Sequence, residues 1–393
     1  MANRIYINGR FLSSPRTGVQ RVGEQLIRAM DRAIALDPGQ YGERFELLEP
    51  ARANRALSLD HIRSIRFGGL PPILWEQITL PWQSRRGLSL NLCNVGPVAK
   101  RQAVTMVHDA QVYTTPQSYS APFRLWYRFL QPLLGKRHRL ILTVSEYSKA
   151  QLASCGIAPA SKIKVIYNGV DHVLDFGHDD AIVAGAGLRR GRYALGMASL
   201  QPHKNTAVLL KAWGQQACGD VRLALFGHVD RAAFETAYGR LPENVVLLGR
   251  ISDAQLRSLL EQALCYVCPS TTEGFGLPVL EAMTLGCPAI AAPCGALPEV
   301  CGDAVLYADP HDAEAWGRAV MRLVQDPQKR AELVEAGRTQ AQPFNWANAA
   351  GALLDALSAL NDAPLNDAPL NDAPINDAHL NEKVPLREKG SRQ

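Results

Sequence analysis

Apolar and polar positions follow two recurring patterns along this chain. Short runs that are almost wholly apolar recur, and such runs are typical of strands buried on both faces of a parallel sheet. A loop follows each run, and several runs then lead into stretches with apolar residues three and four positions apart, which predict amphipathic helices. Because strand, loop and helix alternate from residue 4 to residue 360, the sequence predicts an α/β protein.

The predicted strands fall into two groups. They are the runs 4–8, 103–109 and 140–148, and then 193–200, 221–227, 245–251 and 263–268. The segment 173–192 between the groups is rich in glycine and charge and has no period, which is typical of a connection between domains. We therefore predict domains at 1–172 and 193–345, a linker at 173–192 and a last helix at 346–360.

The tail 361–393 repeats the unit Asn-Asp-Ala-Pro-Leu. A proline in almost every unit prevents a helix, and the units are too short and polar to form a core. We expect the tail to be disordered and assign it no chemistry.

The loop after the run 263–268 contains the most informative pattern, Pro269-Ser-Thr-Thr-Glu273-Gly-Phe-Gly-Leu-Pro278. Pro278 suits the first turn of a helix, where its missing N–H is not needed. Free backbone N–H groups and the helix dipole at such a corner attract an anion such as phosphate. Gly274 and Gly276 let the backbone approach a ligand closely.

Two carboxylates flank this corner, Glu273 in the loop and Glu281 in the helix. A carboxylate beside a phosphate is repelled unless it binds hydroxyl groups instead. A ligand that carries both phosphate and sugar hydroxyls accounts for both features. The alternative is an ordinary glycine-containing loop that binds nothing, with Glu281 stabilising its own helix.

Glu273 and Glu281, with seven residues between them in EGFGLPVLEAMTLGCPAIAAPCGALPEV, resemble the signature of the family 4 retaining glycosyltransferases. That resemblance covers roughly residues 1–360 and implies the GT-B fold, in which two Rossmann-like domains face a cleft and a C-terminal helix crosses back. It also implies transfer of a hexose from a nucleoside-diphosphate sugar with retention of configuration.

The resemblance assigns roles to particular residues. His108, at the end of a predicted strand, would hydrogen-bond the donor sugar and support charge at the reacting centre, with Asp109 as its orienter. Lys204 would neutralise the leaving diphosphate, and Glu273 would hold sugar hydroxyls, with covalent nucleophilic attack as the less favoured role. The other donor-binding residues that the resemblance implies are Gly18, His203, Arg250, Ile251, Phe275, Gly276, Leu277 and Glu281.

The chain departs from the family pattern near Lys204. Many members place an Arg five residues earlier, where this chain has Ser199, and others place an Arg directly before the Lys, where it has His203. Either His203 would then assist Lys204 at the diphosphate, or the helix dipole and a second cation such as Arg250 would do so.

Composition and charge narrow the range of binding partners and cellular locations that we expect. The net charge of +5 is too small to indicate nucleic-acid binding, but it suits a phosphorylated substrate or an anionic membrane surface. No apolar run of membrane-spanning length and no signal-peptide core is present, and we expect a cytoplasmic protein, with association with the inner face of the membrane as an option. Cys265 and Cys268 lie in a predicted buried strand and are interpreted as small hydrophobes.

The segment 123–139 interleaves aromatic residues with Arg and Lys. It is either an amphipathic helix whose cations are simply solvated, which we favour, or a surface that docks on an anionic membrane.

The absence of an Asp-x-Asp motif predicts a reaction without metal or other cofactor. The region 75–109 resembles the acceptor domains of bacterial polysaccharide transferases. It suggests mannose transfer from GDP-mannose to a polyprenyl-diphosphate-linked oligosaccharide, in exopolysaccharide or O-antigen biosynthesis. UDP-glucose or another hexose donor is the alternative. A sugar-nucleotide 2-epimerase and a non-catalytic sugar-nucleotide sensor are alternatives of other classes, and the presence of His108 argues against the sensor.

Overall fold

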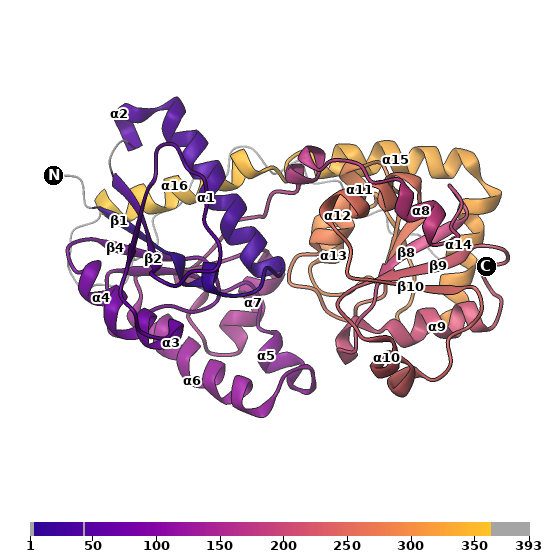
Figure 1. The fold of residues 1–393 in the computed structure, drawn as a ribbon, viewed down its shortest axis with the longest axis horizontal. Coiled ribbons are helices and arrows are strands. Elements are labelled where there is room, and N and C mark those ends of the chain that lie inside the picture. The colour runs from indigo at the N-terminus through magenta and orange to yellow at the C-terminus, as the bar shows by residue number, and fades with distance from the viewer. Residues whose placement is uncertain (1–3, 42–43, 363–393) are drawn as a thin grey trace, which may run out of the picture. The chain divides into compact units, whose positions relative to one another are not determined.

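The computed structural model of the protein describes residues 4–41 and 44–362, so the predicted repeats from residue 363 onward lie outside the described part. Within it, two all-parallel sheets form the frame (Figure 1). The first has the order β3-β2-β1-β4-β5-β6-β7. Its strands are β1 (Ile5–Asn8), β2 (Phe45–Pro50), β3 (Arg63–Phe67), β4 (Leu88–Asn91), β5 (Ala103–Met106), β6 (Leu140–Thr143) and β7 (Ile163–Val165).

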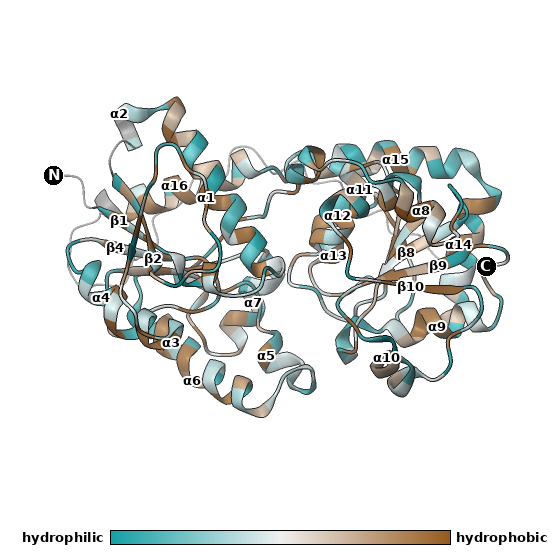
Figure 2. Cartoon of the chain, viewed as in Figure 1, coloured by the Kyte–Doolittle hydropathy of each residue, from teal (hydrophilic) through white to brown (hydrophobic). Residues whose placement is uncertain are grey.

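The second sheet has the order β10-β9-β8-β11-β12-β13. Its strands are β8 (Tyr193–Met197), β9 (Arg222–Phe226), β10 (Val245–Gly249), β11 (Cys265–Cys268), β12 (Ala289–Ala291) and β13 (Leu306–Tyr307). Every residue of β11 and β12 is buried, and Figure 2 shows β8, β9 and β10 as apolar ribbons. The predicted fold of two parallel α/β domains is confirmed.

In each sheet the strand order changes direction at one point, because strands are first added on one side of the central strand and then on the other. The reversal lies between β1 and β4 in the first sheet and between β8 and β11 in the second. Helices on either side of such a point leave in opposite directions, so a crevice opens outside the carboxyl ends of the two central strands. The loops after β8 and β11 are therefore neighbours, although more than sixty residues of sequence separate them.

Helices connect the strands in both halves. Those of the first half are α1 (Gly18–Leu36), α2 (Pro38–Tyr41), α3 (Pro72–Leu74), η3 (Trp75–Thr79), α4 (Leu80–Gln83), α5 (Gln111–Thr114), α6 (Ala121–Arg137) and α7 (Glu146–Ser154). Those of the second are α8 (Ala181–Gly185), α9 (Thr206–Gly214), α10 (Arg231–Tyr238), α11 (Asp253–Gln262), α12 (Leu277–Thr284), α13 (Leu297–Cys301), α14 (Ala313–Gln325), α15 (Pro327–Ala341) and α16 (Trp346–Asp362). Short helical turns are η1 (Gly9–Ser13), η4 (Pro116–Ser118), η5 (Ala160–Lys162), η6 (Asp171–Asp175) and η7 (Pro202–Lys204).

The last helix returns to the first half of the chain. α16 packs against α1, as the predicted crossing helix requires. Its first residue, Trp346, is fully buried, and its backbone N–H donates to Asp171 Oδ1 at 2.8 Å. The indole Nε1–H donates to His172 Nδ1 at 3.1 Å. The segment that leaves the first half at residue 172 and the helix that returns to it therefore meet in one buried cluster.

The sequence did not lead us to predict the strands β2, β3, β4, β7, β12 and β13. Polar residues interrupt the apolar pattern of β2 and β3. β2 reads Phe-Glu-Leu-Leu-Glu-Pro, yet all six residues are buried. Both carboxylates are paired, since Arg4 donates to Glu46 at 3.0 Å and Arg66 donates to Glu49 at 2.7 Å. A buried carboxylate is tolerated when it is paired in this way.

The segment predicted as a linker contains more structure than its composition suggested. It includes the end of η6 and the short helix α8, which packs on α11. The backbone N–H of Asp179 also donates to Ser258 Oγ at 2.9 Å, which fastens the segment to the second half of the chain.

Gly135 lies in α6 where this helix packs against the backbone of Ile157, and its substitution tests that contact. A Cβ added there would lie 1.7 Å from the backbone oxygen of Ile157, so we expect Gly135→Ala to lower the free energy of unfolding by about 1–3 kcal/mol or more. Denaturant unfolding measures the change. Gly351→Ala, in α16, is the matched control, because a Cβ there meets nothing within 4 Å and alanine favours a helix. Equal losses in the two variants would contradict the observed packing.

Candidate active site

The two loops at the centre of the second sheet bring predicted site residues together. Lys204 ends the turn η7 after β8, and Glu273 lies in the loop after β11. Lys204 Nζ lies 2.8 Å from Glu273 Oε1, and both side chains are largely buried. A cavity of about 10 Å³ is lined by both residues and by Pro278 of α12.

Burial by itself disfavours charge on both groups of this pair. The carboxylate of Glu273 nevertheless raises the pKa of Lys204 above its ordinary value. Conversely, Lys204 outweighs the burial of Glu273 and lowers the pKa of that carboxyl. Both groups are therefore charged at neutral pH, and they form a buried ion pair.

The start of α12 provides free hydrogen-bond donors beside this pair. Gly276 adopts the left-handed conformation (φ 95°) and caps the helix. Within the described chain, the backbone N–H groups of Phe275, Gly276 and Leu277 have no acceptor, and Pro278 has no N–H to offer. Such donors at a helix N-terminus are suited to bind an anion.

Gly274 brings the same loop against the first sheet. A Cβ there would lie 2.9 Å from Asp109 Cβ, so the close approach requires glycine. The carbonyl of Gly274 accepts hydrogen bonds from Ser145 Oγ at 2.6 Å and from Ser148 Oγ at 3.0 Å. The loop after β11 is thus fastened to the loop after β6, and His108 and Asp109 lie next to it.

His108 is a buried, neutral imidazole. Its Nε2 donates to the carbonyl of Leu92 at 2.8 Å, and burial lowers the pKa of the ring to about 4. Nδ1 is therefore unprotonated at neutral pH, and it has no partner among the described residues. The ring can accept a hydrogen bond from a hydroxyl group, but it carries no positive charge. Asp109 Oδ1 accepts from the backbone N–H of Gln111 at 2.9 Å and makes no hydrogen bond to the imidazole.

Family models and known proteins are similar to this chain over most of its length. The family model described as glycosyltransferase family 4 matches residues 88–174, and the model described as glycosyl transferases group 1 matches residues 188–340. The chain is 29% identical to O-antigen chain mannosyltransferase B of Escherichia coli, over 88% of this chain and 97% of that protein. It is also 29% identical to O-antigen chain mannosyltransferase RfbU of Salmonella typhimurium, over 59% of this chain and 63% of that protein.

Solved structures share the fold at low sequence identity. Sucrose-phosphate synthase from Thermosynechococcus elongatus superposes with a TM-score of 0.68 at 20% identity, covering 91% of this chain and all of that one. HepE from Anabaena, in complex with UDP, superposes with a TM-score of 0.66 at 18% identity over the same share of this chain and 100% of its own. The chain has the GT-B fold, and the family models support a glycosyltransferase. Its two sheets are the two Rossmann-like halves of that fold.

The structure of this glycosyltransferase places the other predicted donor-binding residues around the same edge of the sheets. Gly18 begins α1, and a Cβ there would meet nothing within 4 Å, so packing does not demand glycine at this position. Arg250 and Ile251 follow β10, which is separated from β8 by β9. Arg250 is exposed and Ile251 is partly buried, and neither is brought into contact with the pair of Lys204 and Glu273.

His203 does not supply the second cation that the family pattern led us to seek. Its ring is buried, and its Nδ1 lies 2.7 Å from Ser118 Oγ in the first half of the chain. Burial, assisted by the charge of Lys204, lowers the pKa of this imidazole to about 4, so the ring is neutral at neutral pH. Its carbonyl accepts from the backbone N–H of Thr271 at 2.8 Å, which ties the loops after β8 and β11 together.

The sequence analysis missed His172, which it treated as the end of the first domain. Its Nδ1 accepts the hydrogen bond from Trp346, so Nε2 carries the ring proton. Nε2 lies 3.3 Å from Glu281 Oε1, and both side chains are buried. His172 therefore lies beside Glu281, the carboxylate expected at the ribose, although its Nε2 makes no hydrogen bond within the described chain. No local sequence signal marks this contact, because it joins two segments more than a hundred residues apart.

The cysteines behave as the sequence suggested. Cys265 and Cys268 are buried in β11, and burial raises the pKa of the Cys268 thiol to about 12. Among residues 4–41 and 44–362, no group of three or more His, Cys, Asp or Glu side chains is arranged to hold a metal ion. Catalysis without metal stays a prediction.

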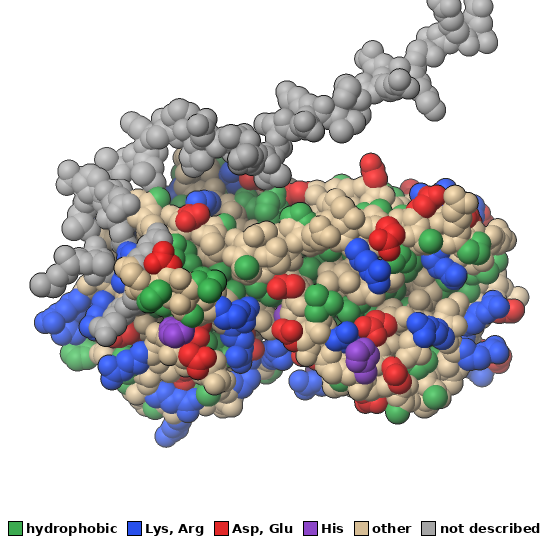
Figure 3. Space-filling model, turned by 90° about the horizontal axis from the view of Figure 1, so that it is seen from above, with side chains coloured by type: hydrophobic (Ala, Val, Ile, Leu, Met, Phe, Trp, Pro, Cys, Tyr) green, Lys and Arg blue, Asp and Glu red, His purple; other side chains and the backbone are tan. Residues whose placement is uncertain are grey.

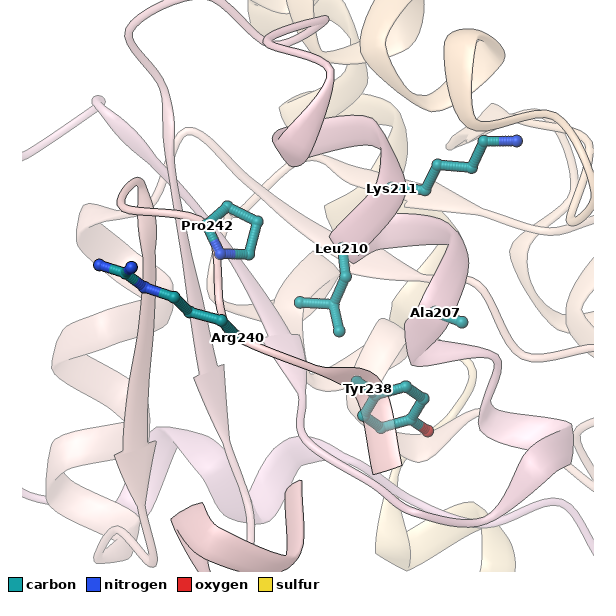
Figure 4. A pocket seen from close by; sticks show the side chains of 6 residues that line it. All are labelled: Ala207, Leu210, Lys211, Tyr238, Arg240 and Pro242. Atoms are coloured by element: carbon teal, nitrogen blue, oxygen red, sulfur yellow. The ribbon is translucent and has the colours of Figure 1, made fainter. Parts of the chain in front are cut away.

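A larger hollow of about 280 Å³ lies elsewhere on the second half (Figure 4). It is lined by Ala207, Leu210, Lys211, Tyr238, Arg240 and Pro242. Figure 4 shows the charged ends of Lys211 and Arg240 pointing away from each other and out of the hollow. None of the predicted site residues lines it, and the cations do not converge on a common ligand.

The ion pair predicts a specific dependence of stability on pH. The pKa of Glu273 is lowered on folding, so its contribution is complete above the ordinary value of 4.5 and is lost as the pH falls through the folded value. The pKa of Lys204 is raised, so its contribution is complete below 10.5 and is lost as the pH rises through its folded value.

We therefore expect Glu273→Gln alone or Lys204→Met alone to lower the free energy of unfolding by about 3–5 kcal/mol at pH 7, because each leaves a buried charge unpaired. The double variant should lose less than the sum of the two. Urea unfolding at pH 7, at pH values below 4.5 and at pH values above 10.5 measures these differences. Additive losses would show that the two groups do not interact.

Proposed function

We propose that this glycosyltransferase is a retaining α-mannosyltransferase that uses GDP-mannose and acts in exopolysaccharide or O-antigen biosynthesis. The acceptor is a saccharide carried on polyprenyl diphosphate at the inner face of the cytoplasmic membrane. The names of the Escherichia coli and Salmonella relatives support mannose and O-antigen. The observation that carries the catalytic assignment is the ion pair of Lys204 and Glu273 beside the free N–H groups of α12, next to His108.

In the proposed complex, the donor diphosphate accepts hydrogen bonds from the N–H groups of residues 275–277 and contacts Lys204. A phosphate there would contact the Lys204 ammonium, which also pairs with Glu273 Oε1. Glu273 Oε2 could then accept a hydrogen bond from a sugar hydroxyl. The unprotonated Nδ1 of His108 is suited to accept from another hydroxyl of the same sugar. Glu281, whose carboxylate lies beside His172, binds the ribose hydroxyls.

The proposed reaction proceeds on one face of the sugar. The bond between the anomeric carbon and the β-phosphate oxygen breaks while the acceptor oxygen bonds to the same carbon from the same side. The acceptor proton passes to the departing phosphate oxygen, so the products are GDP and an α-linked mannoside. Lys204 and the α12 dipole offset the charge that grows on the diphosphate, and no metal is required for that purpose.

A UDP-hexose donor is the second candidate. A structure of HepE from Anabaena holds UDP-glucose, and its fold matches this chain with a TM-score of 0.65. At 18% identity this likeness supports the fold alone, so the names of the closer sequence relatives decide our preference for GDP-mannose.

The donor base can be tested by thermal unfolding with GDP, UDP, ADP and dTDP, each with and without Mg²⁺. We expect GDP to raise the melting temperature without metal, because a ligand at about 100 times its Kd stabilises the folded state by about 2.7 kcal/mol. Glu281→Gln should weaken this effect, whereas Glu314→Gln, an exposed glutamate on α14, should not. A preference for UDP would overturn the mannosyl assignment and leave the transferase intact.

Transfer itself tests the catalytic roles. We expect Lys204→Met to lower kcat by about 10²–10³-fold, because a charge-stabilising group at the leaving diphosphate is lost. Lys211→Met, an exposed lysine on α9, is the matched control and should retain full turnover. NMR of the product should show an α-linkage. Turnover of the Lys204 variant near that of the wild type, with its fold intact, would refute the role of this lysine.

A further inference from the structure

An exposed apolar stripe runs along the segment from α3 to α4. Leu74, Ile78 and Trp82 recur every four residues through η3, a spacing that keeps their side chains on one side of a helical segment. All three are exposed, and Trp82 reaches 65%. The guanidinium of Arg85 lies 4.6 Å from the centre of the Trp82 ring, so a cation lies on this aromatic side chain.

A second apolar stripe lies on α6. Leu125 and Phe129, one turn apart, are 74% and 63% exposed, and Trp126 beside them is also exposed. The opposite side of the helix holds Leu130 and Leu134 in the core, so α6 is apolar toward solvent as well as toward the protein. Figure 2 shows apolar residues on both α3 and α6.

The two stripes belong to neighbouring elements, because both are fastened to the loop 95–98. Gln77 of η3 donates to the carbonyl of Gly96 at 3.0 Å and accepts from the N–H of Val98 at 3.0 Å. Arg137, in the last turn of α6, donates to the carbonyl of Val98 at 2.8 Å. We call the exposed apolar residues of α3–α4 and α6, with their neighbouring cations, the apolar-cationic surface.

Charge in this part of the chain has one sign. From residue 61 to residue 145 the sequence has eleven Lys and Arg residues, but its only acids are Glu76 and Asp109. Glu76 is buried, and the exposed cations include Arg85, Arg86 and Arg128. By contrast, the face drawn in Figure 3 mixes acidic and basic side chains.

We propose that the apolar-cationic surface docks on a bilayer that carries anionic phospholipids. Exposed Trp, Phe and Leu side chains enter the boundary between headgroups and acyl chains, and the surrounding arginines bind the anionic headgroups. A second copy of this chain would bring the same cations against these, so charge complementarity favours the anionic membrane. No helix of the described chain is long and apolar enough to cross a bilayer, and the contact is therefore peripheral.

The buried side of the same elements faces the acceptor half of the proposed site. Glu76 of η3 accepts from Arg10 Nε and from Asn8 Nδ2, both at 2.8 Å. Asn8 ends β1 and Arg10 lies in the turn after it, at the reversal point of the first sheet. Docking through η3 and α6 thus sets the loop after β1 near the membrane. This deepens the proposed function, since it gives a lipid-linked acceptor a route to the site.

Flotation of the full chain with vesicles tests the docking. We expect binding to vesicles of phosphatidylglycerol and phosphatidylethanolamine, little binding to phosphatidylcholine, and weaker binding at high salt. The variants Trp82→Ser/Phe129→Ser and Arg85→Gln/Arg86→Gln should each lower the bound fraction about tenfold or more. The matched controls Leu36→Ser and Arg190→Gln, exposed residues outside the surface, should bind as the wild type does.

Several outcomes would overturn the proposal. These are no binding to anionic vesicles, equal binding to phosphatidylcholine, surface variants that bind like the wild type, or a dimer seen by light scattering that Trp82→Ser/Phe129→Ser dissociates. Melting temperatures of all variants establish that they are folded. The GDP-induced shift, measured on the same samples, reports on the donor site separately, so failure of the docking and failure of the proposed function are distinguishable.

Discussion

The structure of the site depends on one buried ion pair. Lys204 and Glu273 come from loops that meet only because β8 and β11 are hydrogen-bonded neighbours at the reversal of the second sheet. Neither charge would be stable alone in this environment, so the two loops and the start of α12 are positioned together. A diphosphate that arrives there meets an ammonium and free N–H groups that are already oriented, and little rearrangement is then needed during the reaction.

Much of the frame could be predicted from sequence, because buried parallel strands are apolar on both faces. The runs that became β1, β5, β8 and β11 are of this kind, and the closing helix α16 also follows from its pattern. β2 could not be predicted, since Glu46 and Glu49 look like surface residues until Arg4 and Arg66 are seen to pair with them. Long-range pairing of this kind leaves no periodic signal.

The candidate site was likewise only partly predictable from the sequence. Similarity to a family indicated Lys204, Glu273 and His108 as candidates, but it contained no information on their charge. The neutral state of His203 follows from its burial and from the charge of Lys204, and these are properties of the folded environment. His172 was overlooked for the same reason, because its contact with Glu281 exists only after the chain has folded.

The cluster of His172, Trp346 and Glu281 has a thermodynamic consequence. One imidazole accepts a hydrogen bond from the crossing helix α16 at its Nδ1, and its Nε2 lies 3.3 Å from the Glu281 carboxylate. A displacement of α16 that moves this ring would therefore also change the environment of the carboxylate. By reciprocity, a ligand that engaged Glu281 would change the stability of the α16 contact by the same free energy. The anchoring of the last helix and the surroundings of Glu281 thus share a single aromatic ring.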